Sequence, residues 1–351
     1  MTQIITPRQT LPLHSDAPLI VNVNRNHTME SYHAVDIAVC DADGKVIIGL
    51  GDVERPIFPR SAMKPLQAIA LAEKYVQGDM MPAIEDSEWS IICASHNGQP
   101  IHSAAVSQLL KKFNLEPSCL ICGAHWSIER NAMVEQVQNL KAPERIHNNC
   151  SGKHSGMLVL AHLMGVTNEG YAAITHPVQQ SIIGVLDAMT GVDILSFTHG
   201  FDGCGAPAVS APLGNWARAF ALFADHDQLP PHRAEACARI TRGIASAPLL
   251  LAGERRLCSA LATAFGASIT AKTGAEGVYA AALHELGLGV MLKCRDGQTR
   301  AAEVALGAVL HAIGYDMPAS LDPFFRPILR NWEGDEIGDI TVDGGIMVSN
   351  A

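Results

Sequence analysis

A serine and a lysine three residues apart are the first residues in the sequence whose types and spacing suggest chemistry. The segment Ser61–Lys64 (SAMK) follows Pro59 and precedes apolar residues at helical spacing as far as Tyr75. Residues three apart on a helix share a face, so we expect the Lys64 amine to reach the Ser61 hydroxyl. A lysine of lowered pKa is a base that can turn a serine hydroxyl into a nucleophile. The alternative is a helix cap followed by a solvated lysine, because Ser-x-x-Lys is common by chance.

Two more short motifs offer the same serine and lysine chemistry. Ser95–Asn97 (SHN) lies in a polar turn, and Lys272–Gly274 (KTG) lies just before an expected pair of strands. With SAMK, and in this order, they resemble the Ser-x-x-Lys, Ser-x-Asn and Lys-Thr-Gly set of serine β-lactamases and penicillin-binding proteins. Ser95 follows Lys64 more closely than in β-lactamases, so we expect the intervening helical region to differ.

A third group of residues has the character of metal ligands. Cys150 and His154 are one helical turn apart with Lys153 beside them, and Cys204 lies in a glycine-rich loop next to Asp202. Two thiolates, one nitrogen and a water would make a four-coordinate zinc site with one open position. By chemistry alone His154 is the preferred nitrogen ligand. The alternative is a pair of buried free thiols, the commoner state of intracellular cysteine.

The elements that must position these residues form an α+β pattern. Ala62–Tyr75 and Ala301–Ile313 are expected helices, Trp89–Ala94 is a short buried strand or helix end, and the chain from about Ile101 is mainly helical. Short β-branched segments predict strands at both ends of the chain: Leu19–Asn24, Ala34–Val39, Lys45–Gly51, Gly277–Leu286, Leu288–Lys293 and Ile337–Val342.

We therefore predict an antiparallel sheet made from both chain ends, with a helix-rich region inserted between them. The prediction is one catalytic unit over residues 1–351. Its sheet lobe comprises residues 1–60 and 265–351, and its mainly helical lobe comprises residues 61–264.

Composition excludes several classes of protein. At 351 residues, 48% hydrophobic and 17% charged, the chain can bury a full core. No apolar run reaches the roughly 18 residues of a membrane helix, and the first twenty residues make a poor secretory signal. A net charge of −10 without a basic cluster disfavours nucleic acid. Nine cysteines, an odd number, preclude a complete disulfide framework, so we expect a cytoplasmic protein.

Taken together, the motifs closely resemble those of the Rhizobium-type (class 3) L-asparaginases. The resemblance runs from about Pro56 to Gly307 and rests on the segments SAMKPLQ, CASHNGQ, HNNCSGKHSGML, FDGCGAP and AKTGAEG. It implies the serine β-lactamase and glutaminase-like fold and a homodimer. It also implies hydrolysis of L-asparagine to L-aspartate and ammonia.

The resemblance also implies roles for individual residues. Ser61 becomes the nucleophile with Lys64 as its base, and Ser95 with Lys272 becomes a second Ser-Lys pair in the same pocket. Zinc would be held by Cys150, Lys153, Cys204 and water. Lysine is an uncommon ligand because it must first lose its proton.

Three more side chains are expected around the substrate. Its α-carboxylate and α-amine need opposite charges, for which Arg60 and Asp202 are candidates. Asp202 and His154 are placed beside the metal or in the substrate pocket.

Two other functions remain open at this point. A serine glutaminase or β-lactamase-like hydrolase of the same fold would differ in its substrate. A zinc-binding or asparagine-sensing protein without catalysis would bind tightly and release no ammonia, although a binding protein has no need of activated nucleophiles.

Overall fold

The main sheet is built from both ends of the described chain. The computed structural model describes residues 13–78 and 82–342, and in it nine strands form one sheet. Seven of the strands follow the order β12-β13-β2-β3-β11-β10-β9, and neighbours in this order are antiparallel. In addition, β4 pairs with β3 in antiparallel fashion, and β1 pairs with β4 in parallel. The strands are β1 (His14–Ser15), β2 (Leu19–Arg25), β3 (Thr28–Cys40), β4 (Val46–Leu50), β9 (Ile269–Gly274), β10 (Val278–Leu283), β11 (Leu288–Cys294), β12 (Ile328–Arg330) and β13 (Glu336–Val342).

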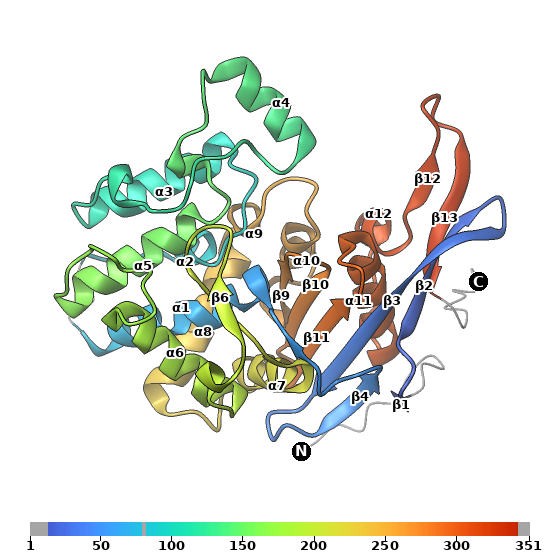
Figure 1. The fold of residues 1–351 in the computed structure, drawn as a ribbon, viewed down its shortest axis with the longest axis horizontal. Coiled ribbons are helices and arrows are strands. Elements are labelled where there is room, and N and C mark those ends of the chain that lie inside the picture. Colours follow the sequence, from blue (N-terminus) through green and yellow to red (C-terminus); the bar gives the residue numbers. More distant parts are fainter. Residues whose placement is uncertain (1–12, 79–81, 343–351) are drawn as a thin grey trace.

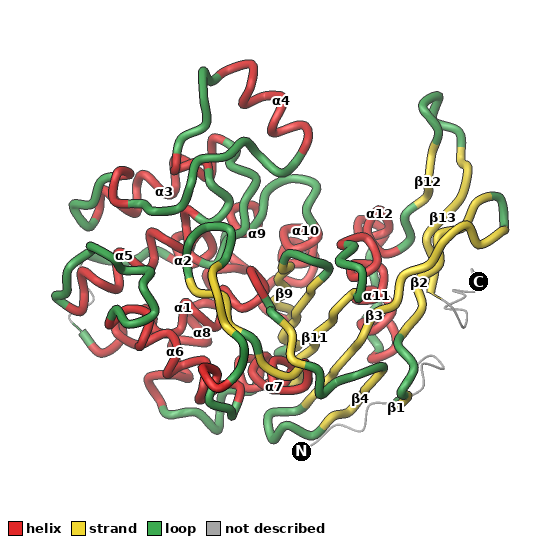
Figure 2. Tube along the Cα trace, viewed as in Figure 1, coloured by secondary structure: helices red, strands yellow, loops and turns green. Residues whose placement is uncertain are grey.

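Helices fill the chain between β4 and β9 and lie beside the sheet (Figures 1 and 2). Two short pairs of strands, β5 (Pro56–Ile57) with β8 (Ala211–Pro212) and β6 (His199–Phe201) with β7 (Pro207–Val209), lie in this region. The helices are α1 (Lys64–Gln77), α2 (Asp86–Ile92), α3 (Pro100–Lys112), α4 (Arg130–Asn139), α5 (Ser151–Met164), α6 (Pro177–Thr190), α7 (Leu213–Ala224), α8 (Pro231–Ser246), α9 (Pro248–Leu251), α10 (Leu257–Phe265), α11 (Thr299–Ile313) and α12 (Asp322–Phe325).

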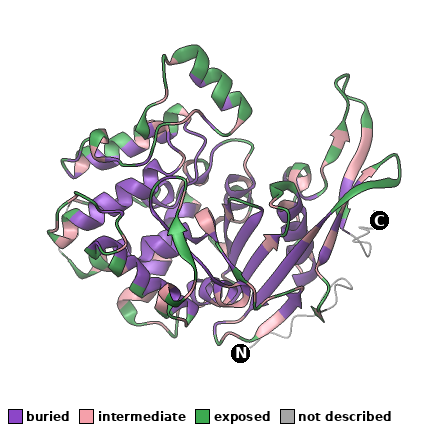
Figure 3. Cartoon of the chain, viewed as in Figure 1, coloured by how far each residue is buried: buried purple, intermediate pink, exposed green. Residues whose placement is uncertain are grey.

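Both faces of the central strands are covered, so every residue of β10 is buried (Figure 3). On one face, a Cβ at Gly289 of β11 would meet the backbone of α7, which packs directly on the strand. On the other face, Tyr279 of β10 contacts Cys258 of α10. Because Lys272 pairs with Ala280, and Tyr279 with Thr273, Lys272 points to the face that α7 covers.

The predicted architecture is confirmed, with differences in detail. All six predicted strands are present, and β3 begins earlier than expected, at Thr28. Trp89–Ala94 is the end of helix α2 and the turn after it. The Lys272–Gly274 motif is itself part of strand β9, which pairs antiparallel with β10. No helix in the described ranges is long and apolar enough to cross a membrane.

Candidate active site

Ser61 lies in a tight turn where the chain passes from the sheet to the helices. Arg60–Met63 forms a 3₁₀ turn, and α1 begins directly after it at Lys64. This turn packs against β9 and β10. A Cβ at Gly274 would come within 2.2 Å of the Pro59 carbonyl oxygen, so only glycine allows this approach. The approach holds the half-buried Ser61 against the strand that carries Lys272.

The Lys64 amine is buried and fully engaged. It donates to the Ala94 carbonyl, to Ser95 Oγ at 2.9 Å and to Cys150 Sγ at 3.2 Å. No hydrogen bond between Lys64 and Ser61 is recorded, in contrast to the expectation from their spacing. The turn before Lys64 has 3₁₀ rather than α geometry, which changes the relative direction of the two side chains. The structure thus brings Lys64 to the second serine of the predicted set.

Ser95 is 3% exposed and lies in a loop that a second loop fixes in place. The Ser95 amide donates to the Leu251 carbonyl at 3.0 Å, and the Asn97 amide donates to the Ala252 carbonyl at 2.9 Å. The Asn97 side chain donates to the Glu254 carbonyl and accepts from Arg256 at 2.7 Å. The side-chain nitrogen and oxygen of Asn97 are therefore both hydrogen-bonded within the protein, and these bonds hold the loop that carries Ser95.

Arg256 is a residue that the sequence did not reveal. It lies 159 positions from Asn97 and belongs to no motif, so only the fold brings the two together. The one local signal is Gly253 three residues earlier, whose positive φ and close approach to Asn97 mark a tightly packed loop.

Lys272 is completely buried, and its amine donates to the Thr273 carbonyl at 3.0 Å. Burial, with smaller contributions from the positive charges of Lys64 and Arg256, lowers the pKa of Lys272 to about 7 against the opposing effect of Cys258. A large share of this amine is therefore neutral at neutral pH. A neutral buried amine can accept a proton, as a general base must.

The three predicted metal ligands come together in one buried cluster. Lys153 Nζ donates to Cys204 Sγ at 3.0 Å, and both side chains are 4% exposed. A hydrogen bond from Cys204 lowers the pKa of Cys150 well below its usual range, despite burial and with help from Lys64 and Lys153. Burial opposes the charged form of Lys153, but the negative groups around it, Cys150 first, outweigh burial and raise the pKa of Lys153. The cluster thus holds a thiolate beside an ammonium.

The position of the cluster depends on close packing of α5 against α2. A Cβ at Gly152 would lie 1.9 Å from the Ile91 carbonyl oxygen, so the glycine between Cys150 and Lys153 lets the start of α5 approach the end of α2. Ser95 follows α2 by a few residues. The same contact therefore brings the thiols close to the Ser-Lys residues.

Arg60 and Asp202 form an ion pair at the edge of the cluster. Arg60 donates to Asp202 Oδ1 at 2.7 and 2.8 Å, and Lys153 Nζ lies 3.9 Å from Asp202 Oδ2. These two cations outweigh burial and lower the pKa of Asp202. The pair places one positive and one negative group together, with Arg60 next to Ser61 in the chain. That the two groups hold a zwitterionic substrate stays a prediction.

His154 is fully buried behind the thiols. Its Nδ1 lies 2.7 Å from the Tyr171 hydroxyl, and its Nε2 has no hydrogen-bond partner. Burial lowers the pKa of His154 well below its usual range, with a further contribution from Lys153, so the ring is neutral. An unsatisfied buried nitrogen of this kind is suited to a water or a ligand atom.

A second group of metal-type ligands lies elsewhere, at His33, Cys294 and Asp296. His33 Nδ1 lies 2.6 Å from Asp296, and the Cys294 thiol donates to the other carboxylate oxygen at 2.9 Å. Arg300 donates to His33 Nε2 at 3.1 Å. Both ring nitrogens are thus satisfied, and the group ties β3 to the end of β11 as a hydrogen-bond network.

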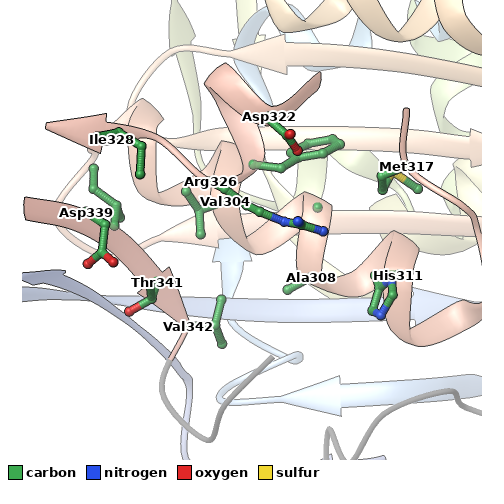
Figure 4. Close-up of a pocket in the computed structure, with 13 residues that line it drawn as sticks. Val304, Ala308, His311, Met317, Asp322, Arg326, Ile328, Asp339, Thr341 and Val342 are labelled. Carbon is green, nitrogen blue, oxygen red and sulfur yellow. The ribbon is translucent and has the colours of Figure 1, made fainter. Parts of the chain in front are cut away.

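Two cavities bear on the location of the site. One, of about 560 Å³, is lined by Arg60 and lies beside the Arg60–Asp202 pair. The other, of about 270 Å³, lies between α11, α12 and β13 and is mainly apolar, with Val304, Ala308 and Ile328 on its walls (Figure 4). None of the predicted site residues lines the second cavity.

Several solved structures are similar to this chain at low sequence identity. A putative beta-lactamase from Bacteroides dorei DSM 17855 is 13% identical, with 80% of this chain and 93% of that one covered and a TM-score of 0.45. A beta-lactamase from Mycobacterium bovis is 15% identical, with coverage of 80% and 95% and a TM-score of 0.42. The protein Mglu in its native form is 14% identical, with coverage of 81% and 66% and a TM-score of 0.40. No curated protein matches the sequence.

The family comparison is more direct. The model of the L-asparaginase II family matches residues 21–342, which include most of β2, every strand from β3 to β13, the Ser-Lys motifs and the thiol cluster. The match agrees with the L-asparaginase resemblance of the motifs. This chain therefore belongs to the L-asparaginase II family of amidohydrolases.

Proposed function

We propose that this protein hydrolyses the side-chain amide of L-asparagine to L-aspartate and ammonia through a Ser-Lys nucleophile and an acyl-enzyme. The observation that carries the proposal is the Lys64 amine, buried and hydrogen-bonded to Ser95 Oγ at 2.9 Å within a family of known chemistry. Ser61 is the proposed nucleophile, because it is the more accessible serine and follows Arg60, whose ion pair with Asp202 is the proposed substrate-binding pair.

Lys64 donates three hydrogen bonds in this structure, so it must first pass a proton through Ser95 to the neutral amine of Lys272. Ser61 Oγ then attacks the amide carbonyl while its proton passes to the neutral Lys64. The tetrahedral intermediate carries an oxyanion, for which backbone N–H groups at the start of the 3₁₀ turn are the proposed donors. Each such donor is typically worth about 3 kcal/mol. Collapse of the intermediate breaks the C–N bond, the leaving nitrogen takes a proton, and ammonia departs. Water then hydrolyses the ester on Ser61 and releases L-aspartate.

Ser95 and Lys272 are the proposed proton relay. The lysine with its pKa near 7 can take up and return a proton during each cycle. Ser95 already bonds to Lys64, so a proton received from Ser61 can move from Lys64 toward the leaving nitrogen. The positive charge of Lys64 contributes to the lowered pKa of Lys272, which favours a neutral amine at Lys272.

The proposed substrate-binding groups are the two charged side chains that form an ion pair with each other in this structure. We propose that Arg60 binds the α-carboxylate and Asp202 the α-amine of L-asparagine. The substrate would replace one ion pair with two, so little charge is left unpaired in a partly buried site. His154, whose Nε2 has no hydrogen-bond partner, is proposed as one further polar group of this pocket.

Zinc is proposed at Cys150, Lys153 and Cys204. The residues fit the ion because two sulfur atoms and one nitrogen converge in a buried cluster that already accommodates the positive charge of the Lys153 ammonium. Soft sulfur ligands of this kind suit zinc rather than magnesium or calcium. When bound, zinc would supply a fixed positive charge that organises the pocket, after Lys153 has given up a proton.

A homodimer in the cytoplasm completes the proposal. Two neighbouring hairpins at the far end of the sheet expose apolar side chains, among them Tyr32 and Trp332, the latter 97% exposed. Exposed apolar groups of this size are typical of contact surfaces.

All nine cysteines are free thiols, which is compatible with the proposed cytoplasmic, reducing compartment.

The test of the function is ammonia release by the purified protein. L-asparagine, L-glutamine and a chromogenic β-lactam are compared at matched concentrations. Preferential hydrolysis of L-asparagine supports the proposal. Faster release from L-glutamine would indicate a glutaminase, cleavage of the β-lactam would indicate a β-lactamase-like hydrolase, and tight binding of L-asparagine with no ammonia would indicate a binding protein.

A further inference from the structure

The cavity of about 560 Å³ beside the candidate active site has an unusual collection of charges. It lies between the segment Arg55–Arg60, the β6–β7 hairpin and the end of β11. Its walls carry four cationic side chains and one carboxylate: Arg55, Arg60, Lys293, Arg295 and Glu276. The volume is sufficient for a small organic molecule.

Two of the cations share one carboxylate. Arg295 donates to Asp36 Oδ1 at 2.7 Å, and Arg55 lies 3.2 Å from Asp36 Oδ2. Asp36 is completely buried below the cavity, whereas the two guanidinium groups are 41% and 37% exposed. Asp52 also acts on Arg295, and both guanidinium side chains keep exposed surface toward the opening, where a further anion can reach them.

Lys293 adds a third positive charge to the same space. Its amine donates to the backbone carbonyl of Glu276, and no ion pair of Lys293 is recorded among the described residues. Burial lowers the pKa of Lys293, and repulsion from Arg55 adds to this effect against the opposing effects of Cys294, Glu276 and Asp296. Both effects would be relieved by an anion bound between Lys293 and Arg55.

One negative group balances part of this charge. Glu276 lies in the β9–β10 turn with a φ of 62°, and its carboxylate makes no hydrogen bond recorded within the described chain. A carboxylate at the rim of a cationic cavity is the arrangement that binds an ammonium group on an otherwise anionic ligand. The cavity therefore matches a molecule with more than one negative charge and one positive charge.

We propose that this cavity binds a small amino-dicarboxylate, the class to which the L-aspartate product belongs. The carboxylates would lie against Lys293 and the arginines, which recognise carboxylates in a bidentate manner, and the ammonium would lie against Glu276. L-asparagine has one carboxylate fewer, so the cavity favours product over substrate. The identity of the ligand as a reaction product rests on the proposed function, whereas its chemical class rests on the cavity alone.

Arg60 links the cavity to the candidate active site. It lines the cavity and at the same time holds Asp202. A carboxylate that attracts Arg60 into the cavity weakens its bond to Asp202 and so changes the binding of substrate. Because such coupling is reciprocal, substrate in the active site weakens the binding of the dicarboxylate. The expected behaviour is product inhibition with a component that excess substrate does not overcome.

Calorimetric titration of the intact protein tests the binding site without relying on turnover. L-aspartate, succinate and inorganic phosphate are titrated into the wild-type protein and into Lys293→Met, Arg55→Met, Glu276→Gln and the charge-matched control Lys141→Met, an exposed lysine outside the cavity. Lys293→Arg keeps the charge and is expected to keep binding.

We expect two L-aspartate sites in the wild type and in Lys141→Met. Lys293→Met and Arg55→Met are expected to weaken one of them at least tenfold, and Glu276→Gln to weaken L-aspartate but not succinate. Unchanged L-aspartate binding in both cation variants, with Lys293→Met folded by circular dichroism, would overturn the proposal. Preference of the cavity for phosphate over succinate would also overturn it, because the ligand class would then be wrong.

Inhibition kinetics separate this proposal from the proposed function. Where the protein hydrolyses L-asparagine, the non-competitive part of L-aspartate inhibition is expected to disappear in Lys293→Met, with kcat and KM unchanged. Purely competitive inhibition, identical in both proteins, contradicts the coupling through Arg60. Absence of any ammonia release would contradict the proposed function, while the titrations would still decide the existence of the dicarboxylate site.

Discussion

The Lys64 amine connects Ser95 Oγ, at 2.9 Å, with Cys150 Sγ, at 3.2 Å. One buried cation thus contacts both the serine chemistry and the thiol cluster. A change of charge at Cys150, by protonation or by a bound metal, is therefore felt directly by the proposed base. This contact is the structural reason to expect the metal site and the Ser-Lys site to depend on each other.

Replacement of the two serines distinguishes their roles. Ser61→Ala is expected to abolish hydrolysis with the fold intact, because it removes the atom that forms the acyl bond. Ser95→Ala is expected to reduce kcat and leave measurable turnover, because water can take the place of its hydroxyl. Steady-state ammonia release measures both. Retention by Ser61→Ala of more than a tenth of the wild-type kcat, about 1.4 kcal/mol in barrier, would transfer the nucleophile to Ser95 or elsewhere.

Lys272 should control the pH dependence of catalysis. Below about pH 7 its amine is protonated and cannot accept a proton, so kcat is expected to rise as the pH passes through this value. Lys272→Met should lower kcat more than it changes KM, because a proton relay acts in the transition state. The pH profile of kcat for the two proteins is the measurement. A variant with unchanged kcat and only a raised KM would make Lys272 a substrate-binding residue.

The same lysine should shape the pH dependence of stability. Between about pH 7 and 10.5 the unfolded chain holds a proton on Lys272 that the folded chain has released. The free energy of unfolding therefore rises with pH across this interval. Below pH 7 the folded protein must bury the charged Lys272, so the loss of stability caused by this lysine is then at its largest. Denaturant unfolding of wild type and Lys272→Met at pH 6 and pH 9 measures it. Equal pH slopes in the two proteins would show that the buried amine keeps its proton.

The metal site makes a separate prediction. Native protein purified without chelator is expected to hold one zinc per chain, and Cys150→Ser to hold none, with Cys119→Ser as a thiol control outside the cluster. Stripping the metal should raise KM more than it lowers kcat, because the Ser-Lys residues already provide nucleophile and base. Elemental analysis and kinetics of the stripped protein measure the two parts.

Two results would contradict this view of the metal. Absence of stoichiometric zinc from the native protein would remove the site. Complete loss of kcat on stripping, with the fold intact, would make the metal a direct participant in the reaction.

Much of the fold could be predicted from local sequence. The strands at both ends follow from β-branched segments and glycine turns, such as the Asp41–Gly44 turn between β3 and β4. The proximity of Cys150 and Lys153 could be predicted because both lie at the start of one helix. That Cys204 joins them, with Lys153 rather than His154 as the nitrogen ligand, was implied by the family resemblance and not by spacing.

The partner of Lys64 could not be predicted in the same way. Helical spacing indicates Ser61, but the 3₁₀ turn at Arg60–Met63 is imposed by the packing of that turn against β9, a contact between distant parts of the chain. The bond between Arg256 and Asn97 likewise spans 159 positions. The spacing of residues along the sequence describes one helix or strand at a time. It therefore cannot predict contacts that form only when distant elements pack together.

Identification of the acylated residue tests the central claim most directly. The protein is mixed with L-asparagine, quenched in acid within a turnover, digested and analysed by peptide mass spectrometry, with Ser61→Ala as the matched control. We predict an aspartyl ester on the peptide that contains Ser61 in the wild type, and no ester in the variant. An ester on the peptide that contains Ser95, or steady ammonia release without any ester on a serine, would contradict the account.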